Sequence, residues 1–115
     1  MENELHLYKV VIQTKNYFVL KDFYLKSMML EQEFADDSAG ITECKMGKGF
    51  LRIERVREHP TTKNIFGLST KDWRKAKTHF SNLHISTSGV KVKEGKCMFE
   101  IADPDGNLIQ IIEVK

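Results

Sequence analysis

The sequence predicts an α+β protein in which one order of elements, a strand, a helix and three strands, occurs twice. Two observations support this prediction. Apolar residues alternate with polar ones in several short segments, as in half-buried strands, and two longer segments show apolar residues at helical spacing. A chain of 115 residues is also long enough for one compact domain with a modest core.

The first half of the chain contains the first copy of this order. A strand is expected over residues 5–13, and a helix should follow to about Met29, with Asn16 as its N-cap. The extended segments expected after this helix are residues 30–34, 41–46 and 50–56, with a turn over residues 36–40 between the first two.

The second half repeats the pattern. A strand is expected over residues 63–68 and a helix over about 71–83, capped by Ser69 or Thr70. Trp73, Ala76 and Phe80 belong to its apolar stripe, so Trp73 is interpreted as a core residue. The remaining strands are expected over residues 84–87 and 90–93, and in a terminal hairpin over residues 97–102 and 108–114.

The turn of the terminal hairpin has an informative sequence, Asp103-Pro104-Asp105-Gly106-Asn107. Pro104 fixes φ at the first corner, and the residues after it tolerate the positive φ that closes the turn. This motif resembles the signature near the C-terminus of the vicinal oxygen chelate superfamily, which includes glyoxalase I, extradiol dioxygenases, and fosfomycin- and bleomycin-resistance proteins. Phe23-Tyr24 and Phe66-Gly67-Leu68 are similar to the superfamily's residues at the corresponding places.

The resemblance covers essentially the whole chain and implies its architecture. It implies two βαβββ modules whose curved sheets form an incomplete mixed-sheet barrel around a cavity, with the helices outside. The whole chain, 1–115, would be one such domain, with module one at about 5–57 and module two at about 63–114. The resemblance also implies a homodimer, which would cover exposed sheet edges.

Metal-dependent members of the superfamily hold a divalent ion with side chains that project into the cavity. The resemblance places these ligand positions at Lys9, Lys63 and Gln110 of this sequence. A lysine ammonium has no lone pair and repels a cation, and a carboxamide supplies no charge. The four histidines show no HxH or HxxxH spacing either. We therefore expect neither a metal nor another cofactor.

Strand alternation predicts which residues face the cavity. These are Lys9, Val11, Phe50, Arg52, Glu54, Lys63, Ile65, Met98, Glu100, Leu108, Gln110 and Ile112. The residues between them, from Tyr8 to Ile111, are nearly all apolar and should pack beneath the helices. The candidate ligand-binding residues are Lys9, Phe50, Arg52, Glu54, Lys63, Glu100 and Gln110. Their charges would either bind a polar or anionic organic ligand or pair with one another.

The leading hypothesis is a metal-free, small-molecule-binding protein of the bleomycin-resistance type. The alternatives are a lyase, isomerase or dioxygenase with an unconventional metal site, and a non-catalytic structural or regulatory module. A net charge of +2 does not favour nucleic acid, and no apolar run approaches the roughly 18 residues of a membrane helix. The N-terminus does not resemble a secretory signal, so we expect a cytoplasmic protein in which Cys44 and Cys97 are free thiols.

Overall fold

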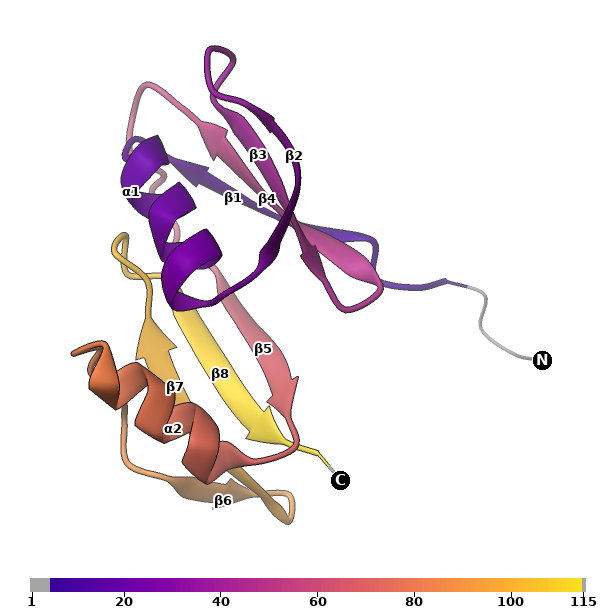
Figure 1. The fold of residues 1–115 in the computed structure, drawn as a ribbon, viewed down its shortest axis with the longest axis vertical. Coiled ribbons are helices and arrows are strands. Elements are labelled where there is room, and N and C mark those ends of the chain that lie inside the picture. Colours follow the sequence, from indigo (N-terminus) through magenta and orange to yellow (C-terminus); the bar gives the residue numbers. More distant parts are fainter. Residues whose placement is uncertain (1–4, 115) are drawn as a thin grey trace. The chain divides into compact units, whose positions relative to one another are not determined.

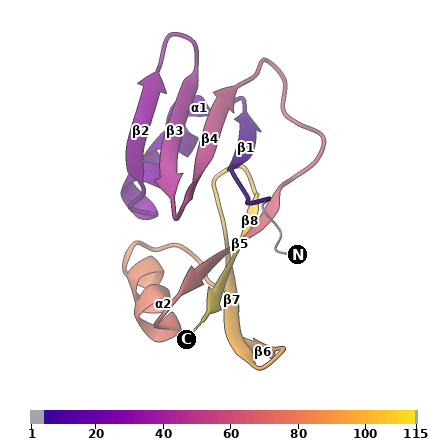
Figure 2. The ribbon, with the colours of Figure 1, turned by 90° about the vertical axis from the view of Figure 1, so that its right-hand side faces the viewer.

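A computed structural model describes residues 5–114 and divides the chain into two compact units, Met1–Pro60 and Thr61–Lys115. In the first unit the elements are β1 (Lys9–Thr14), α1 (Tyr17–Asp22), a π-helix η1 (Phe23–Ser27), β2 (Glu31–Asp36), β3 (Ile41–Met46) and β4 (Gly49–Arg55). The strands form one sheet in the order β1-β4-β3-β2, in which only the β1–β4 pair is parallel (Figures 1 and 2).

The second unit has the same topology. Its elements are β5 (Ile65–Thr70), α2 (Trp73–Asn82), β6 (Lys91–Lys93), β7 (Lys96–Ala102) and β8 (Leu108–Glu113). The sheet order is β5-β8-β7-β6, with β5 parallel to β8 and the other pairs antiparallel (Figure 1). The predicted βαβββ order, repeated twice, is confirmed.

Each helix covers one face of its own sheet, and the core of each unit lies between them. In the first unit Ile12, Leu51 and Ile53 are fully buried. In the second, Phe99 and Ile109 are fully buried, and the Phe99 ring meets the buried Phe80 ring of α2 at 6.2 Å between centroids. The alternation of apolar residues therefore identified the core faces of the central strands correctly.

The largest differences between the predicted and observed strands are at three places. β1 begins at Lys9 instead of Leu5, and its partner β4 begins at Gly49, so residues 5–7 would extend past the start of β4. Tyr8, expected beneath the helices, is 66% exposed and its ring lies edge-on to Phe50. Residues 84–87 form no strand, and β5 begins at Ile65, which leaves Lys63 in the preceding loop.

Both helix starts also differ from the predictions. The Asn16 side chain makes no capping hydrogen bond, and its backbone N–H instead donates to Thr14 Oγ1 at 2.8 Å. Asp72, expected inside the second helix, is its N-cap, since its carboxylate accepts hydrogen bonds from the backbone N–H groups of Arg74 and Lys75, both at 3.1 Å. Trp73 is only half-buried and stacks against the Arg74 guanidinium.

The terminal turn is held by a compact hydrogen-bond network. The buried Asp103 carboxylate accepts from the backbone N–H groups of Asp105 and Asn107, both at 2.9 Å, and from Asn107 Nδ2 at 2.8 Å. Asn107 Oδ1 in turn accepts from the backbone N–H of Asn64 at 2.8 Å, and Gly106 adopts a φ of +86°. The motif thereby fixes the starts of β5 and β8 side by side.

No helix among residues 5–114 has the length and apolar character needed to cross a bilayer. Cys44 and Cys97 are free thiols, and burial raises the pKa of Cys44 to about 11. Cys44 is therefore a packing residue rather than a nucleophile.

Candidate functional site

The face of the first sheet that α1 does not cover carries four of the predicted site residues. The register pairs Lys9 with Phe50 and Val11 with Arg52, and Glu54 lies two residues further along β4 on the same face. Lys9 is exposed, whereas Phe50, Arg52 and Glu54 are half-buried. The first sheet thus brings these four predicted residues onto one surface.

The charges on this surface are paired with one another. Arg52 Nε donates to Glu54 Oε2 at 2.6 Å, and Arg52 Nη1 donates to Glu43 Oε2 at 2.9 Å. The hydrogen bond that Arg52 donates to Glu54, followed by the one that it donates to Glu43, raises the pKa of Arg52 above its usual value. Glu43 was missed in the sequence, although it lies directly opposite Arg52 on β3 and alternation along residues 41–45 could have indicated it. Arg52 therefore belongs to a structural ion-pair network with Glu43 and Glu54.

The corresponding face of the second sheet carries Glu100 and Gln110, which the register places side by side on β7 and β8. Gly67 lies opposite Gln110 on β5. A Cβ at Gly67 would stand 3.3 Å from Ile112 Cδ1 and 3.9 Å from Gln110 Oε1. The missing side chain at Gly67 therefore leaves the room in which the side chains of Gln110 and Ile112 lie.

Lys63 does not lie beside Glu100 and Gln110. It precedes β5, and its Cε lies 3.8 Å from the place a Cβ would occupy on Gly106, in the terminal turn. Within the second unit, the predicted residues Lys63 and Gln110 thus lie at different levels of the sheet, one at the turn and the other within β8.

A pocket of about 220 Å³ opens on the same face as Gln110. Its residues are Lys93, Glu94, Lys96, Met98, Gln110 and Ile112. Met98 and Ile112 are a cross-strand pair on β7 and β8. They supply the apolar part of the lining, and Gln110 supplies a carboxamide that can both donate and accept hydrogen bonds.

The remaining residues of this pocket come from the β6–β7 hairpin, which the sequence analysis did not single out. Glu94 and Gly95 both have positive φ, +55° and +75°, as in a two-residue type I′ turn. This turn sets Lys93 directly opposite Lys96. Gly95 between two predicted strands could have indicated the hairpin, because glycine readily adopts the positive φ that the second position of such a turn requires.

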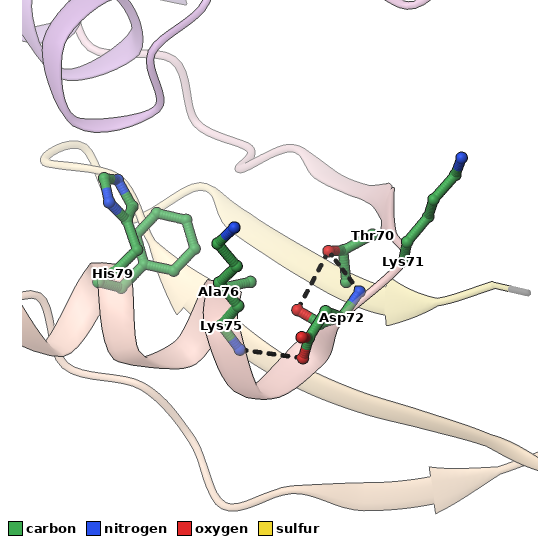
Figure 3. Close-up of a pocket in the computed structure, with 7 residues that line it drawn as sticks. Thr70, Lys71, Asp72, Lys75, Ala76 and His79 are labelled. Atoms are coloured by element: carbon green, nitrogen blue, oxygen red, sulfur yellow. Dashed lines mark hydrogen bonds between the residues drawn. The ribbon is translucent and has the colours of Figure 1, made fainter.

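A larger and more open pocket, of about 500 Å³, lies beside α2 (Figure 3). Its residues are Thr70, Lys71, Asp72, Lys75, Ala76, His79 and Phe80. Asp72 serves the start of the helix there, and none of the predicted site residues takes part. We therefore take the pocket around Gln110 as the candidate site.

Comparison with solved structures identifies the fold. A lactoylglutathione lyase from Agrobacterium tumefaciens matches with a TM-score of 0.84 at 17% identity, over 97% of this chain and 96% of that chain. A glyoxalase family protein from Enterococcus faecalis matches with a TM-score of 0.78 at 19% identity, over 94% and 97%. The chain has the glyoxalase fold.

This glyoxalase fold confirms the two βαβββ modules with mixed sheets that the resemblance to the vicinal oxygen chelate superfamily implied. An integron cassette protein from the mobile metagenome of the Halifax Harbour sewage outfall also has it, with a TM-score of 0.86 at 16% identity over 95% of this chain and 98% of that chain. A scan against protein-family models found no match, and a search of curated proteins found none either.

The resemblance places the superfamily's metal positions at Lys9, Lys63 and Gln110, and these three side chains do not fit a divalent ion. Lys9 and Lys63 offer ammonium groups, which have no lone pair at neutral pH, and Gln110 offers only a neutral oxygen. Within the described range, residues 5–114, no three His, Cys, Asp or Glu side chains come together in a way that could hold a metal ion. The glyoxalase fold is therefore combined here with a donor set that is unsuited to the ion of its metal-dependent members.

Proposed function

We propose that the chain is a metal-free binding protein for a small polar or anionic organic molecule. The observation that carries this proposal is the pocket on the uncovered face of the second sheet, around Gln110. Its lining combines two apolar side chains, Met98 and Ile112, with four polar or charged ones, which suits a ligand that is itself largely polar.

The lining suggests how such a molecule would be held. Met98 and Ile112 would contact its apolar part, and the Gln110 amide would form hydrogen bonds with a polar group. The pocket volume of about 220 Å³ lies below the roughly 300 to 1,000 Å³ typical of drug-sized ligands, so the ligand should be small.

The residue types support binding without a metal. The mechanism shared by the metal-dependent enzymes of the superfamily needs an ion that polarises substrate oxygens, and Lys9, Lys63 and Gln110 are poor donors for it. The lactoylglutathione lyase matched above is 17% identical, and this similarity concerns the fold. We therefore place binding ahead of a lyase, isomerase or dioxygenase activity.

The other candidate residues remain predictions. Glu54 and Arg52 pair with each other on the first sheet, which favours the structural interpretation of those two charges. Lys9, Phe50, Lys63 and Glu100 make no contact that decides between the two interpretations. Homodimer formation is likewise a prediction, and the mass of the protein in solution would test it.

A thermal-shift screen of the full chain with small carboxylates, phosphates and neutral polar molecules tests the proposal. At least one class should raise the melting temperature in proportion to its concentration, because a ligand that binds only the folded state stabilises it. Gln110→Leu should weaken binding by about tenfold, since it removes the amide but keeps the bulk. Gln13→Leu, at an exposed position of β1, is the matched control.

Two results would contradict the proposal. One is a screen in which no compound shifts the melting temperature, as expected for a structural or regulatory module. The other is unchanged binding in Gln110→Leu and in Gly67→Ala, whose new methyl group would stand 3.3 Å from Ile112 Cδ1 and would require that side chain of the pocket to shift. In that case the ligand would bind elsewhere.

A further inference from the structure

We propose that the ligand is an organic anion whose carboxylate or phosphate group is bound between Lys93 and Lys96 at the β6–β7 hairpin. This inference rests on the function proposed above and specifies its ligand class. Both lysines line the pocket, and the register makes them a directly opposed cross-strand pair.

The opposed lysines are unfavourable without an anion. Side chains directly opposite on antiparallel strands have Cβ atoms about 4.5 to 5.5 Å apart, and like charges at such positions destabilise the pair. Lys91 lies on the same face of β6, two residues before Lys93, and adds a further positive charge. An anion between Lys93 and Lys96 would relieve this repulsion and form charge-assisted hydrogen bonds with both ammonium groups.

The protein does not neutralise these lysines from within. The ion pairs between described residues are Lys21–Asp37, Lys26–Asp22, Arg52–Glu43 and Arg52–Glu54, all in the first unit. Glu94, the acidic residue of the pocket, forms no such pair with either lysine. The contrast with Arg52, which two carboxylates neutralise, indicates that the cations of the hairpin are available to an external anion.

Protection of a sheet edge does not by itself explain why both lysines face the pocket. Lysines on exposed edge strands discourage pairing with other chains, and this role suits Lys91 and Lys93 on the short edge strand β6. Lys96 precedes the part of β7 that pairs with β8, since that pairing begins at Met98. Edge protection requires only that these lysines be exposed, whereas an anion site also accounts for their common place in the lining of one pocket.

The rest of the lining sets the shape of the anion. Met98 follows Lys96 by two residues on the same face of β7, and Ile112 lies across from Met98 on β8. Gln110 is the next residue of that face along β8. A ligand with its anionic group at the hairpin would therefore place a short apolar body on Met98 and Ile112 and direct any polar substituent towards Gln110.

The test uses four probes with the full chain: benzoate, phenyl phosphate, benzamide and inorganic phosphate. Titration followed by ¹H–¹⁵N NMR should show benzoate or phenyl phosphate shifting the amide signals of residues 93–98 and 110–112. Benzamide keeps the ring but lacks the charge, so its affinity should be lower by at least about tenfold. Whichever of benzoate and phenyl phosphate has the higher affinity identifies the preferred head group as carboxylate or phosphate. The affinity of inorganic phosphate shows how much a phosphate group contributes to binding without the ring.

Charge variants locate the site. K93Q/K96Q should lower the affinity for the preferred anion by about tenfold or more while leaving benzamide binding unchanged. K45Q/K48Q is the matched control, because it removes the same charge from two exposed lysines at the β3–β4 hairpin of the first unit. It should leave the affinity as it is in the wild-type protein.

The outcomes separate this inference from the proposed function. If benzamide and benzoate bind equally well in this pocket, or if K93Q/K96Q binds the anion as well as K45Q/K48Q does, the anion site is wrong although small-molecule binding stands. If none of the probes shifts these amide signals at millimolar concentration, and the screen of compounds also finds no ligand, both fail.

Discussion

Tyr17 connects the first helix to the turn between β2 and β3. Its ring is buried, and its hydroxyl donates to Asp37 Oδ1 at 2.7 Å and also contacts Thr42 Oγ1. Lys21 Nζ donates to the same Asp37 oxygen at 2.7 Å. Burial raises the pKa of Tyr17, while the hydrogen bond from Lys21, followed by that from Tyr17, lowers the pKa of Asp37.

Removing the Tyr17 hydroxyl should destabilise the protein. In Tyr17→Phe the buried Thr42 loses a hydrogen-bond partner and Asp37 loses a donor, so the free energy of unfolding should fall by about 1 to 2 kcal/mol. Urea unfolding followed by circular dichroism would measure this. Tyr8→Phe is the control, since Tyr8 is 66% exposed and its change should be near zero. Equal effects of the two substitutions would contradict the assigned role of Tyr17.

The lowered pKa of Asp37 predicts that the stability of the fold depends on pH. Because its pKa is lower in the folded than in the unfolded chain, it stabilises the fold above its unfolded pKa of about 3.9. That contribution is lost as the pH falls through the lowered folded pKa. Asp37→Asn should therefore be less stable than the wild-type protein at neutral pH, and the difference should narrow in acid. A stability difference between Asp37→Asn and the wild-type protein that is constant with pH would contradict this assignment. An equally large difference in Asp22→Asn, on the exposed helix surface, would also contradict it.

The sequence could predict which residues share a face, but not all of their partners. Arg52 and Glu54 were placed on one face because strand alternation has a period of two residues. Glu43 was missed because it comes from a neighbouring strand, and its position opposite Arg52 depends on the β3–β4 register. The hairpin lysines were missed for a similar reason, since only the turn at Glu94 and Gly95 sets them opposite each other.

At the scale of elements, the two helices start by different means. The Asp72 carboxylate caps α2, whereas the Asn16 side chain makes no capping hydrogen bond to α1. Asp72→Ala should therefore lower the free energy of unfolding by about 1 kcal/mol. Lys71→Ala, at the exposed residue before the cap, should change it much less, and urea unfolding of both variants provides the comparison. Equal losses in the two variants would contradict the capping role of Asp72.

The first helix differs from the predicted one in its hydrogen bonding. The sequence suggested one helix to about Met29, but α1 ends at Asp22 and continues as the π-helix η1. The adjacent residues Phe23 and Tyr24 are both buried, at 8% and 0% exposure, and their rings meet edge-on at 5.1 Å. Their helical spacing indicated this burial, but the spacing does not distinguish the i→i+5 hydrogen bonds of a π-helix from the i→i+4 bonds of an α-helix.

At the scale of the whole molecule, the doubled order of elements was the strongest prediction because both halves carry the same succession of periodicities. The Asp103 network shows why the terminal motif was informative, since it holds the starts of β5 and β8 through Asn64 and Asn107. The same motif carries no information on chemistry. Sequence similarity in the turn therefore indicated the fold, while the side chains of Lys9, Lys63 and Gln110, which the resemblance places at the metal positions, are poor ligands for a divalent ion.

This combination leads to a prediction for the purified protein. Protein purified without added metal, and measured by inductively coupled plasma mass spectrometry, should contain no stoichiometric zinc, nickel, manganese or iron. EDTA should leave its melting temperature unchanged, because the fold does not depend on a bound ion. Adding each ion to the EDTA-treated protein should not raise that temperature in proportion to concentration.

One tightly held ion per chain, with a melting temperature that falls in EDTA and with loss of the ion in Gln110→Leu, would show that this chain builds a metal site from other groups. Such a site would need the ion to bind strongly enough to overcome its repulsion by nearby ammonium groups, and it would bring the lyase, isomerase and dioxygenase activities back ahead of simple binding.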